Sequence, residues 1–247
     1  MNVMKKLPKK LGNDTIVDAI IEIRFETLFD KNAIFGYIYS MIMNDYKGNV
    51  INLPESQLPA AIREADPNLR FKPLHRIEGE KTIIQIGSNV IAISSKIPYI
   101  GWDEFSSIFF KIVTKINSQD PTVLNKVIRL GIRYVDFFKG DISEKINMTF
   151  KMCENYEHTE DLYIRTTLKD KGFINIVQFS NSANFHGKDQ QTIEKGSLID
   201  IDTSKEYSDS SFLGNIHTEI DNAHSCQKSL FFSTLKDDLI NTLNPIF

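Results

Sequence analysis

Arginine side chains recur on one face of two predicted strands. Glu22 and Arg24 stand two residues apart in the first strand, and Arg129 and Arg133 stand four apart in a later one. Since alternate residues of a strand share a face, each pair projects from one side of a sheet. A guanidinium group binds carboxylate or phosphate through two parallel N–H bonds. If the two strands lie side by side, these residues converge, which predicts an anion-binding site.

Acidic residues elsewhere in the chain offer these arginines internal partners. Asp200 and Asp202 share one face of a predicted strand, and Asp136 lies on the same strand as Arg133. Arg–Asp pairs across a sheet often do no more than fix its register. The sequence therefore leaves two interpretations open: an internal ion-pair network, or a surface that recognises a ligand and includes Asp200 and Asp202.

An aromatic pair stands at the start of a predicted helix. Tyr99 and Trp102 flank the break at Ile100-Gly101. Aromatic side chains beside a glycine can form the wall of a pocket. They can equally well pack the helix against the sheet, as lone tryptophans often do. Trp102 is included among the candidate ligand-binding residues on the first interpretation.

The last predicted helix carries a weak candidate for a metal site. His217, Asp221 and His224 are spaced four and three residues apart, which places them on one side of successive turns. Two imidazoles and a carboxylate can hold a divalent cation. An exposed polar stripe explains the same spacing, and no His-Glu-x-x-His signature accompanies it. We therefore expect no metal.

No catalytic template fits the chain. Gly140-Asp141-Ile142-Ser143 lacks the spacing of a nucleophile elbow. Gly12, Gly36 and Gly48 form neither a dinucleotide-binding loop nor a P-loop. We therefore expect no cofactor, assign no reaction and favour a non-enzymatic protein.

Composition narrows the classes of partner. The chain has 247 residues, a net charge of −3 and a pI of about 6.0, whereas proteins that follow a phosphate backbone usually carry a basic balance. Its one dense basic cluster, Lys5 to Lys10, is expected to be a solvated arm. Cys153 and Cys226 are far apart and are expected to be reduced thiols. With no membrane-length apolar run and no secretory signal, we expect a soluble cytoplasmic protein.

The pattern of apolar residues predicts strands and helices in the order strand, helix, meander, helix, which occurs twice. In the first half we expect strand 15–26, a helix over 31–46 capped by Asp30, an irregular connection over 49–68, strands 69–77, 82–86 and 90–94, and helix 102–118. In the second half we expect strand 126–138, helix 142–155, strands 162–168, 173–180 and 197–203, and one or two helices over 215–243.

This order predicts an α+β protein with duplicated halves, 1–120 and 121–247, that share one antiparallel curved sheet. Ile21-Glu22-Ile23-Arg24-Phe25 aligns with Leu130-Gly131-Ile132-Arg133-Tyr134, which adds local support for a duplication. The helices would pack on one face of the sheet and leave the other polar and open, as in saddle-shaped or helix-grip folds.

Several motifs together resemble a sporadically distributed prokaryotic family of about 250 residues with no established function. The motifs are Leu7-Pro8 through Leu11, Asp14, Ile16-Val17-x-Ala19-x-x-Glu22-Ile23-Arg24-Phe25, Tyr99-x-x-Trp102-x-x-Phe105 and Arg129-Leu130-Gly131-Ile132-Arg133-Tyr134. The resemblance covers nearly the whole chain and implies no catalytic residues. It places Glu22, Arg24, Trp102, Arg133 and Tyr134 inside the family pattern, so Tyr134 joins the candidate ligand-binding residues. The uneven distribution is typical of mobile-element, defence or toxin–antitoxin loci.

These observations favour a binding or regulatory module that recognises a protein partner or a small anionic ligand, as an accessory of such a locus. An enzyme or sensor of a nucleotide or other phosphorylated metabolite is the alternative. Nucleic-acid binding by the open sheet face is a second alternative, which the acidic balance disfavours. A homodimer is left open, and no membrane association is expected.

Overall fold

The protein is an α+β protein built on a large antiparallel sheet with helices. The computed structural model describes residues 7–148, 161–186 and 193–247. Within these residues the strands of the large sheet follow the order β3 (Asn49–Asn52), β4 (His75–Glu78), β5 (Thr82–Ile86), β6 (Val90–Ser95), β2 (Ile16–Glu26), β7 (Lys126–Lys139), β10 (Ile193–Glu206), β9 (Phe173–His186) and β8 (Tyr163–Asp170). A separate pair joins β1 (Lys10–Leu11) to β11 (Pro245–Ile246).

The helices are α1 (Ile34–Ile42), α2 (Ala60–Ala65), α3 (Trp102–Gln119), α4 (Ser211–Gly214), α5 (Ile216–Thr234) and α6 (Asp237–Thr242). Contacts divide the chain into two compact units. The meander unit comprises Asp18–Ile132 and Ser204–Ala223. The hairpin unit comprises Met1–Val17, Arg133–Thr203 and His224–Phe247. Both units draw on residues before and after position 120, and a duplication of the chain stays a prediction.

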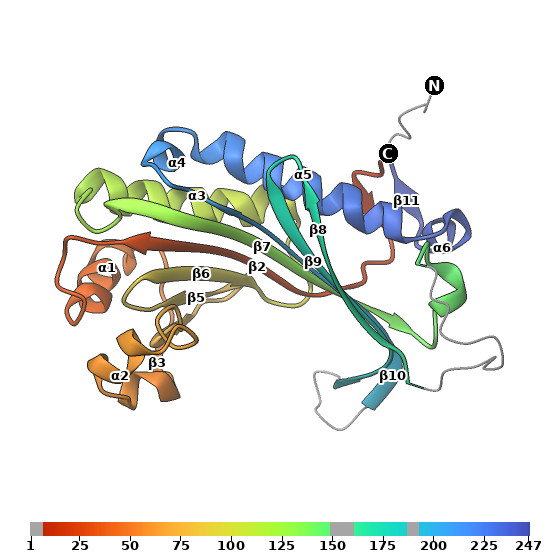
Figure 1. Ribbon diagram of the computed structural model, residues 1–247, viewed down its shortest axis with the longest axis horizontal. Helices are drawn as coiled ribbons and strands as arrows, with labels where there is room; N and C mark the ends of the chain where they lie inside the picture. The colour runs from red at the N-terminus through yellow and green to blue at the C-terminus, as the bar shows by residue number, and fades with distance from the viewer. Residues whose placement is uncertain (1–6, 149–160, 187–192) are drawn as a thin grey trace. The chain divides into compact units, whose positions relative to one another are not determined.

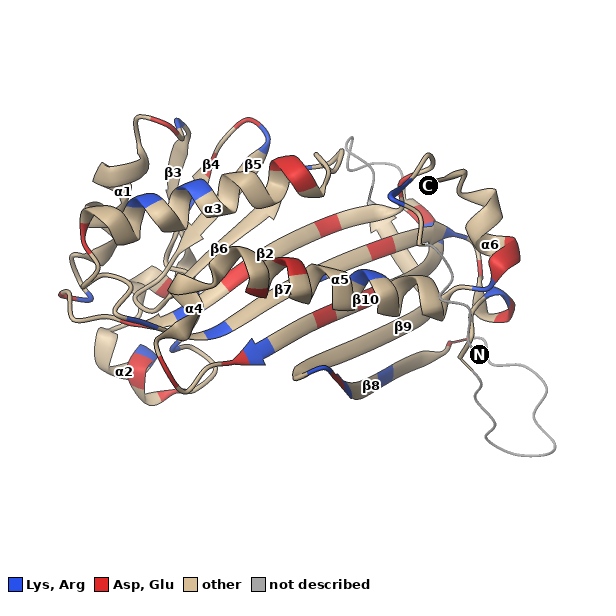
Figure 2. Ribbon diagram, turned by 90° about the horizontal axis from the view of Figure 1, so that it is seen from above, with Lys and Arg blue, Asp and Glu red and all other residues tan. Residues whose placement is uncertain are grey.

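In the meander unit, an antiparallel meander is followed along the sheet by β2. Ile84 of β5 faces Ile93 of β6, and Ile93 in turn faces Ile21 of β2. One face of β2 is buried, whereas Asp18, Glu22 and Arg24 on the other face are half-buried, which confirms the predicted alternation. Figures 1 and 2 show α3 running along these strands. The helix predicted over 102–118 is confirmed as α3, and its apolar residues Phe105, Phe109, Ile112 and Ile116 are all buried.

The segment between α1 and the meander is more ordered than predicted. Within 49–68 the chain forms strand β3, a 3₁₀ turn at Pro54–Gln57 and helix α2. Proline is compatible with these short elements because Pro54 and Pro59 stand at their starts, where no intrahelical N–H is needed. The predicted strand 69–77 is paired only from His75. Figure 1 shows α2 on the side of the sheet away from α3.

The predicted cap of the first helix was wrong. Helix α1 begins after Ala33, and no side chain caps it. The Asp30 carboxylate instead accepts the N–H of Asn32 at 2.8 Å, and its backbone carbonyl accepts that of Ala33 at 3.1 Å. Aspartate favours such local turns as strongly as it favours caps, so the residue type alone cannot separate the two. The predicted apolar stripe of α1 is confirmed.

The hairpin unit is organised by the long hairpin of β8 and β9. Lys171 and Gly172 have φ angles of 49° and 83°, which is the left-handed geometry of a two-residue hairpin turn. The strands predicted over 162–168 and 173–180 are therefore confirmed as the two arms of a hairpin. Phe179 of β9 and Ile199 of β10 pack in a core with Phe231 and Leu235 at the end of α5. Of the one or two helices predicted over 215–243, the structure has two in series, α5 and α6.

A predicted helix over 142–155 is not found in the part of it that the structure describes. Ser143–Lys145 forms only a 3₁₀ turn, and Ile146 bridges to Leu235. Asp141 starts the turn by accepting the N–H of Ser143 at 2.8 Å. Residues 149–160 lie outside the described part and include Cys153. Cys226 is a free, buried thiol, as expected.

Candidate functional site

The first group of predicted site residues meets in the meander unit. One carboxylate oxygen, Glu22 Oε1, accepts Arg24 Nε–H at 2.8 Å and Arg129 Nη1–H at 3.0 Å. A Cβ at position 131 would lie 2.6 Å from Arg129 Nη1. Gly131 thus lets the Arg129 side chain lie close to its own strand, where it reaches Glu22. Two guanidinium groups therefore share one carboxylate oxygen.

A third arginine joins this group through an aromatic ring. Arg24 Cζ lies 4.9 Å from the centre of the Phe71 ring, and Arg70 Cζ lies 5.3 Å from the same centre. Guanidinium groups stack favourably on aromatic faces. Arg24, Arg70 and Arg129 around Glu22 and Phe71 are called the arginine cluster below. Phe71 lies in the loop before β4. Its contact with Arg24 shows that this loop covers part of the strand face that was predicted to be open.

The fourth predicted residue, Arg133, belongs to a closed ion-pair network in the hairpin unit. Arg133 donates from Nε and Nη2 to the two carboxylate oxygens of Asp200, at 2.8 and 2.6 Å. Gln178 donates a further hydrogen bond to Asp200 at 2.7 Å. The Asp200 side chain is 5% exposed. This bidentate pair is the internal network that the sequence left open, and Asp202 follows on the same face of β10, half-buried.

Two residues proposed for the arginine face lie on the opposite side of β7, because successive residues of a strand alternate. Asp136 is buried and accepts Thr15 Oγ1–H at 2.7 Å. It was offered as one possible partner for the arginines, and its side-chain partner in the structure is Thr15. Burial raises its pKa to about 7. The buried Tyr134 ring lies 6.2 Å from the ring of His224 on α5, so helix packing accounts for its position.

Arg24 and Arg133 belong to different units, and their convergence on one surface stays a prediction. Trp102 is the first residue of α3 and is half-buried. Its neighbour Tyr99 packs edge-on against the buried Phe105, with ring centres 5.9 Å apart. This contact supports the interpretation that Tyr99 packs the helix against the sheet rather than forming a pocket wall. A ligand-binding role of Trp102 stays a prediction.

The weak metal candidate on the last long helix is wrong. Across the described ranges, no three His, Cys, Asp or Glu side chains gather where they could hold a metal ion. His217 is exposed and stacks on Phe110, with ring centres 3.9 Å apart. Burial, followed by the positive charge of Lys228, lowers the pKa of His224 to about 3. The two histidines thus have separate packing roles.

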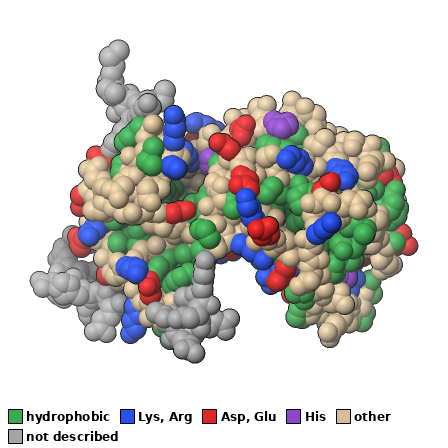
Figure 3. Space-filling model, turned by 180° about the vertical axis from the view of Figure 1, so that it is seen from behind, with side chains coloured by type: hydrophobic (Ala, Val, Ile, Leu, Met, Phe, Trp, Pro, Cys, Tyr) green, Lys and Arg blue, Asp and Glu red, His purple; other side chains and the backbone are tan. Residues whose placement is uncertain are grey.

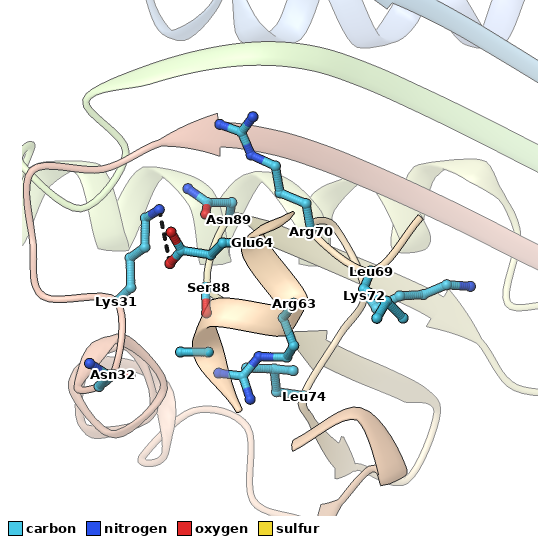
Figure 4. Close-up of a pocket in the computed structure, with 11 residues that line it drawn as sticks. Lys31, Asn32, Arg63, Glu64, Leu69, Arg70, Lys72, Leu74, Ser88 and Asn89 are labelled. Atoms are coloured by element: carbon cyan, nitrogen blue, oxygen red, sulfur yellow. Dashed lines mark ion pairs between the residues drawn. The ribbon is translucent and has the colours of Figure 1, made fainter. Parts of the chain in front are cut away.

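Sequence reasoning missed a small basic pocket in the meander unit. Four basic residues and one acidic residue line it: Lys31, Arg63, Arg70, Lys72 and Glu64. Figure 4 shows Lys31 Nζ directed at the Glu64 carboxylate, and these groups lie 3.3 Å apart. Arg63 donates to the backbone carbonyls of Glu55 and Leu58 and so holds α2 against the preceding turn.

The signal for this pocket was present in the sequence, although it was diffuse. Arg63, Arg70 and Lys72 fall within ten residues of a proline-rich connection. The nearby imidazole of His75 responds to this charge, because burial, followed by the positive charge of Arg63, lowers its pKa. Elsewhere on the face that Figure 3 draws, basic and acidic side chains are interspersed rather than segregated.

Comparison with protein-family models and with curated proteins finds no match for this chain. The resemblance to a sporadic prokaryotic family therefore stays a prediction. Among the helices of the described residues, none has the length and apolar character needed to cross a bilayer.

Proposed function

We propose that the protein is a non-enzymatic binding module and that its arginine cluster takes a small anionic ligand. One observation carries the proposal: the Arg24 guanidinium is held by Glu22 through Nε–H and by the Phe71 ring, on a side chain that is 33% exposed. Arg129 donates to the same Glu22 oxygen, which brings a second guanidinium into the group. Arg70 adds a third guanidinium beside the same Phe71 ring.

Arg24 is the residue best placed to contact the ligand. Its Nε–H is held by Glu22 and its Cζ is stacked over Phe71, which fixes the side chain before any ligand arrives. Throughout residues 7–148, 161–186 and 193–247, no acceptor is found for its two Nη groups, and the side chain is 33% exposed. Immobilising a flexible side chain on binding costs conformational entropy. A guanidinium that is already held in place avoids this cost and so favours binding. Its terminal edge matches a carboxylate or phosphate.

The residues of the cluster support binding rather than catalysis. Arginine keeps its proton at any physiological pH, so it cannot act as a general base. Glu22 is engaged by two guanidinium groups and supplies no nucleophile. Recognition of a protein partner, and an accessory role in a mobile-element or defence locus, remain part of the proposal as further uses of the same surface.

Isothermal titration calorimetry with inorganic phosphate, pyrophosphate, citrate and a mononucleotide, at constant ionic strength, tests the proposal. We expect saturable binding of at least one anion and a loss of about tenfold or more in affinity for Arg24→Ala, the usual effect of removing a charge-assisted hydrogen bond. Arg165→Ala is the matched control, because Arg165 is an exposed arginine on β8 in the hairpin unit. If no anion binds, or if Arg24→Ala binds as tightly as the control, the proposal is wrong.

A further inference from the structure

The pocket of Figure 4 lies beside the arginine cluster and shares a residue with it. We propose that this pocket is a second anion subsite, that the Glu64 carboxylate fills it in the free protein, and that the ligand carries two anionic groups, as a diphosphate or a bisphosphate does. The second part of this inference rests on the proposed function, because the first anionic group is the one assigned to the arginine cluster.

The charges of the pocket are not balanced by its own residues. Glu64 is the single acidic residue among the lining residues, against Lys31, Arg63, Arg70 and Lys72. Arg63 Nη1 donates to two backbone carbonyls, which leaves the charge of the guanidinium in place. Carbonyl partners cannot neutralise a cation, so the lining residues together keep a positive charge beside the one carboxylate.

The Glu64 carboxylate occupies the position beside Lys31 that a ligand anion would take. Its Oε1 lies 3.3 Å from Lys31 Nζ, and the two side chains are 49% and 34% exposed. Exposed pairs of this kind contribute roughly 0 to 1 kcal/mol. A ligand anion can therefore displace Glu64 from Lys31 at little cost. The enclosed space holds little more than one water molecule, so the anion enters only as Glu64 moves out.

Some lining residues of the pocket are held in place by contacts with neighbouring backbone, unlike the exposed Glu64 side chain. Asn89 is buried, its Nδ2–H₂ donates to the carbonyl of Phe25 at 2.9 Å, and its own carbonyl accepts the Phe25 N–H at 3.0 Å. A Cβ at position 87 would lie 2.5 Å from the carbonyl oxygen of Lys72, so Gly87 allows the loop that carries Lys72 to lie close to the β5–β6 turn. Asn89 and Gly87 are held in place, whereas Glu64 is exposed. A ligand anion can therefore replace the Glu64 carboxylate without rearranging the rest of the pocket.

Arg70 connects the pocket to the arginine cluster. It lines the pocket, and its guanidinium stacks on the ring on which Arg24 also stacks. Each Cζ lies within 5.3 Å of the centre of the Phe71 ring, so the two guanidinium groups are at most twice that distance apart. A separation within this limit allows a ligand with two anionic groups to contact both.

Calorimetry with pyrophosphate and with inorganic phosphate, at constant ionic strength, tests the inference on wild type and on four variants. Glu64→Gln removes the competing charge and should tighten pyrophosphate binding about three- to fivefold, the effect of one exposed ion pair. Lys31→Gln should weaken pyrophosphate binding by a similar factor and reduce its advantage over phosphate. Glu194→Gln is the matched control, because Glu194 forms a comparable ion pair with Lys139, at 2.9 Å, in the hairpin unit.

Arg24→Ala separates this inference from the proposed function. If Arg24→Ala weakens binding while Glu64→Gln and Lys31→Gln match the Glu194→Gln control, the arginine cluster binds the anion and the second subsite is refuted. If Glu64→Gln tightens binding while Arg24→Ala has no effect, the pocket binds the anion, and both the proposed function and the two-group ligand are refuted. Equal affinity for phosphate and pyrophosphate in the wild type would also overturn the two-group ligand.

Discussion

Replacing the buried carboxyl group of Asp136 by an amide should stabilise the protein at alkaline pH. The Asp136 side chain is 3% exposed, and burial raises its pKa from 3.8 to about 7, with the nearby Asp14 and Asp200 adding to the rise. The folded protein thus binds this proton more tightly than the unfolded chain does. The stabilisation is complete below pH 4 and is lost as the pH rises through 7. At about 1.4 kcal/mol for each pKa unit, the loss is on the order of 4 kcal/mol.

Asp136→Asn removes the titration and keeps the acceptor oxygen that Thr15 uses. Urea denaturation followed by circular dichroism at pH 4, 5.5 and 8 measures the effect on the free energy of unfolding. We expect the variant to match wild type at pH 4 and to exceed it by up to about 4 kcal/mol at pH 8. Asp161→Asn, at an exposed position, is the control. A variant that is no more stable than wild type at pH 8 would refute the assignment of a buried, weakly acidic carboxyl group.

Three further substitutions have effects that the same denaturation measurement checks. Arg133→Ala should destabilise by about 3 kcal/mol, because it leaves the 5% exposed carboxylate of Asp200 without its cation. His224→Phe should lessen the loss of stability below pH 6.5, since burial, followed by Lys228, lowers the histidine pKa from 6.5 to about 3 and protonation favours the unfolded chain. Gly196→Ala should destabilise by about 3 kcal/mol, as its Cβ would lie 2.0 Å from the Phe138 carbonyl oxygen.

The periodicity of apolar residues was enough to predict the long elements. In β2 the alternation of Ile21, Ile23 and Phe25 with polar residues matches the buried and half-buried faces, and in α3 the stripe from Phe105 to Ile116 is the buried one. Both elements are long, so several residues report the same period. Short elements contain too few residues for this, and β3 and α2 were accordingly missed between prolines.

Predictions that depended on one polar residue were less secure. Asp30 was expected to cap a helix and instead accepts an N–H in the turn before it. Asp136 was one possible partner for the arginines and instead accepts a hydrogen bond from Thr15. In both cases the residue type allowed several partners, and tertiary contacts between distant segments decided among them.

The candidate site was only partly visible for the same reason. Glu22, Arg24 and Arg129 could be found because strand alternation places them on defined faces. Arg70 and Phe71 could not, since they lie in a loop whose path over the sheet is set by tertiary packing. The one available signal for Arg70 and Phe71 was a loop with basic and aromatic residues next to a basic strand face. Such a loop has no fixed residue spacing by which it could be recognised.

Stoichiometry separates the two ion-pair networks, although both use the same residue types. Asp200 gives both of its oxygens to Arg133 and also accepts from Gln178, so this carboxylate is saturated by its own chain. Glu22 meets two guanidinium groups with one oxygen. A guanidinium held in place by a carboxylate and an aromatic ring, as Arg24 is, is what the proposed anion site requires.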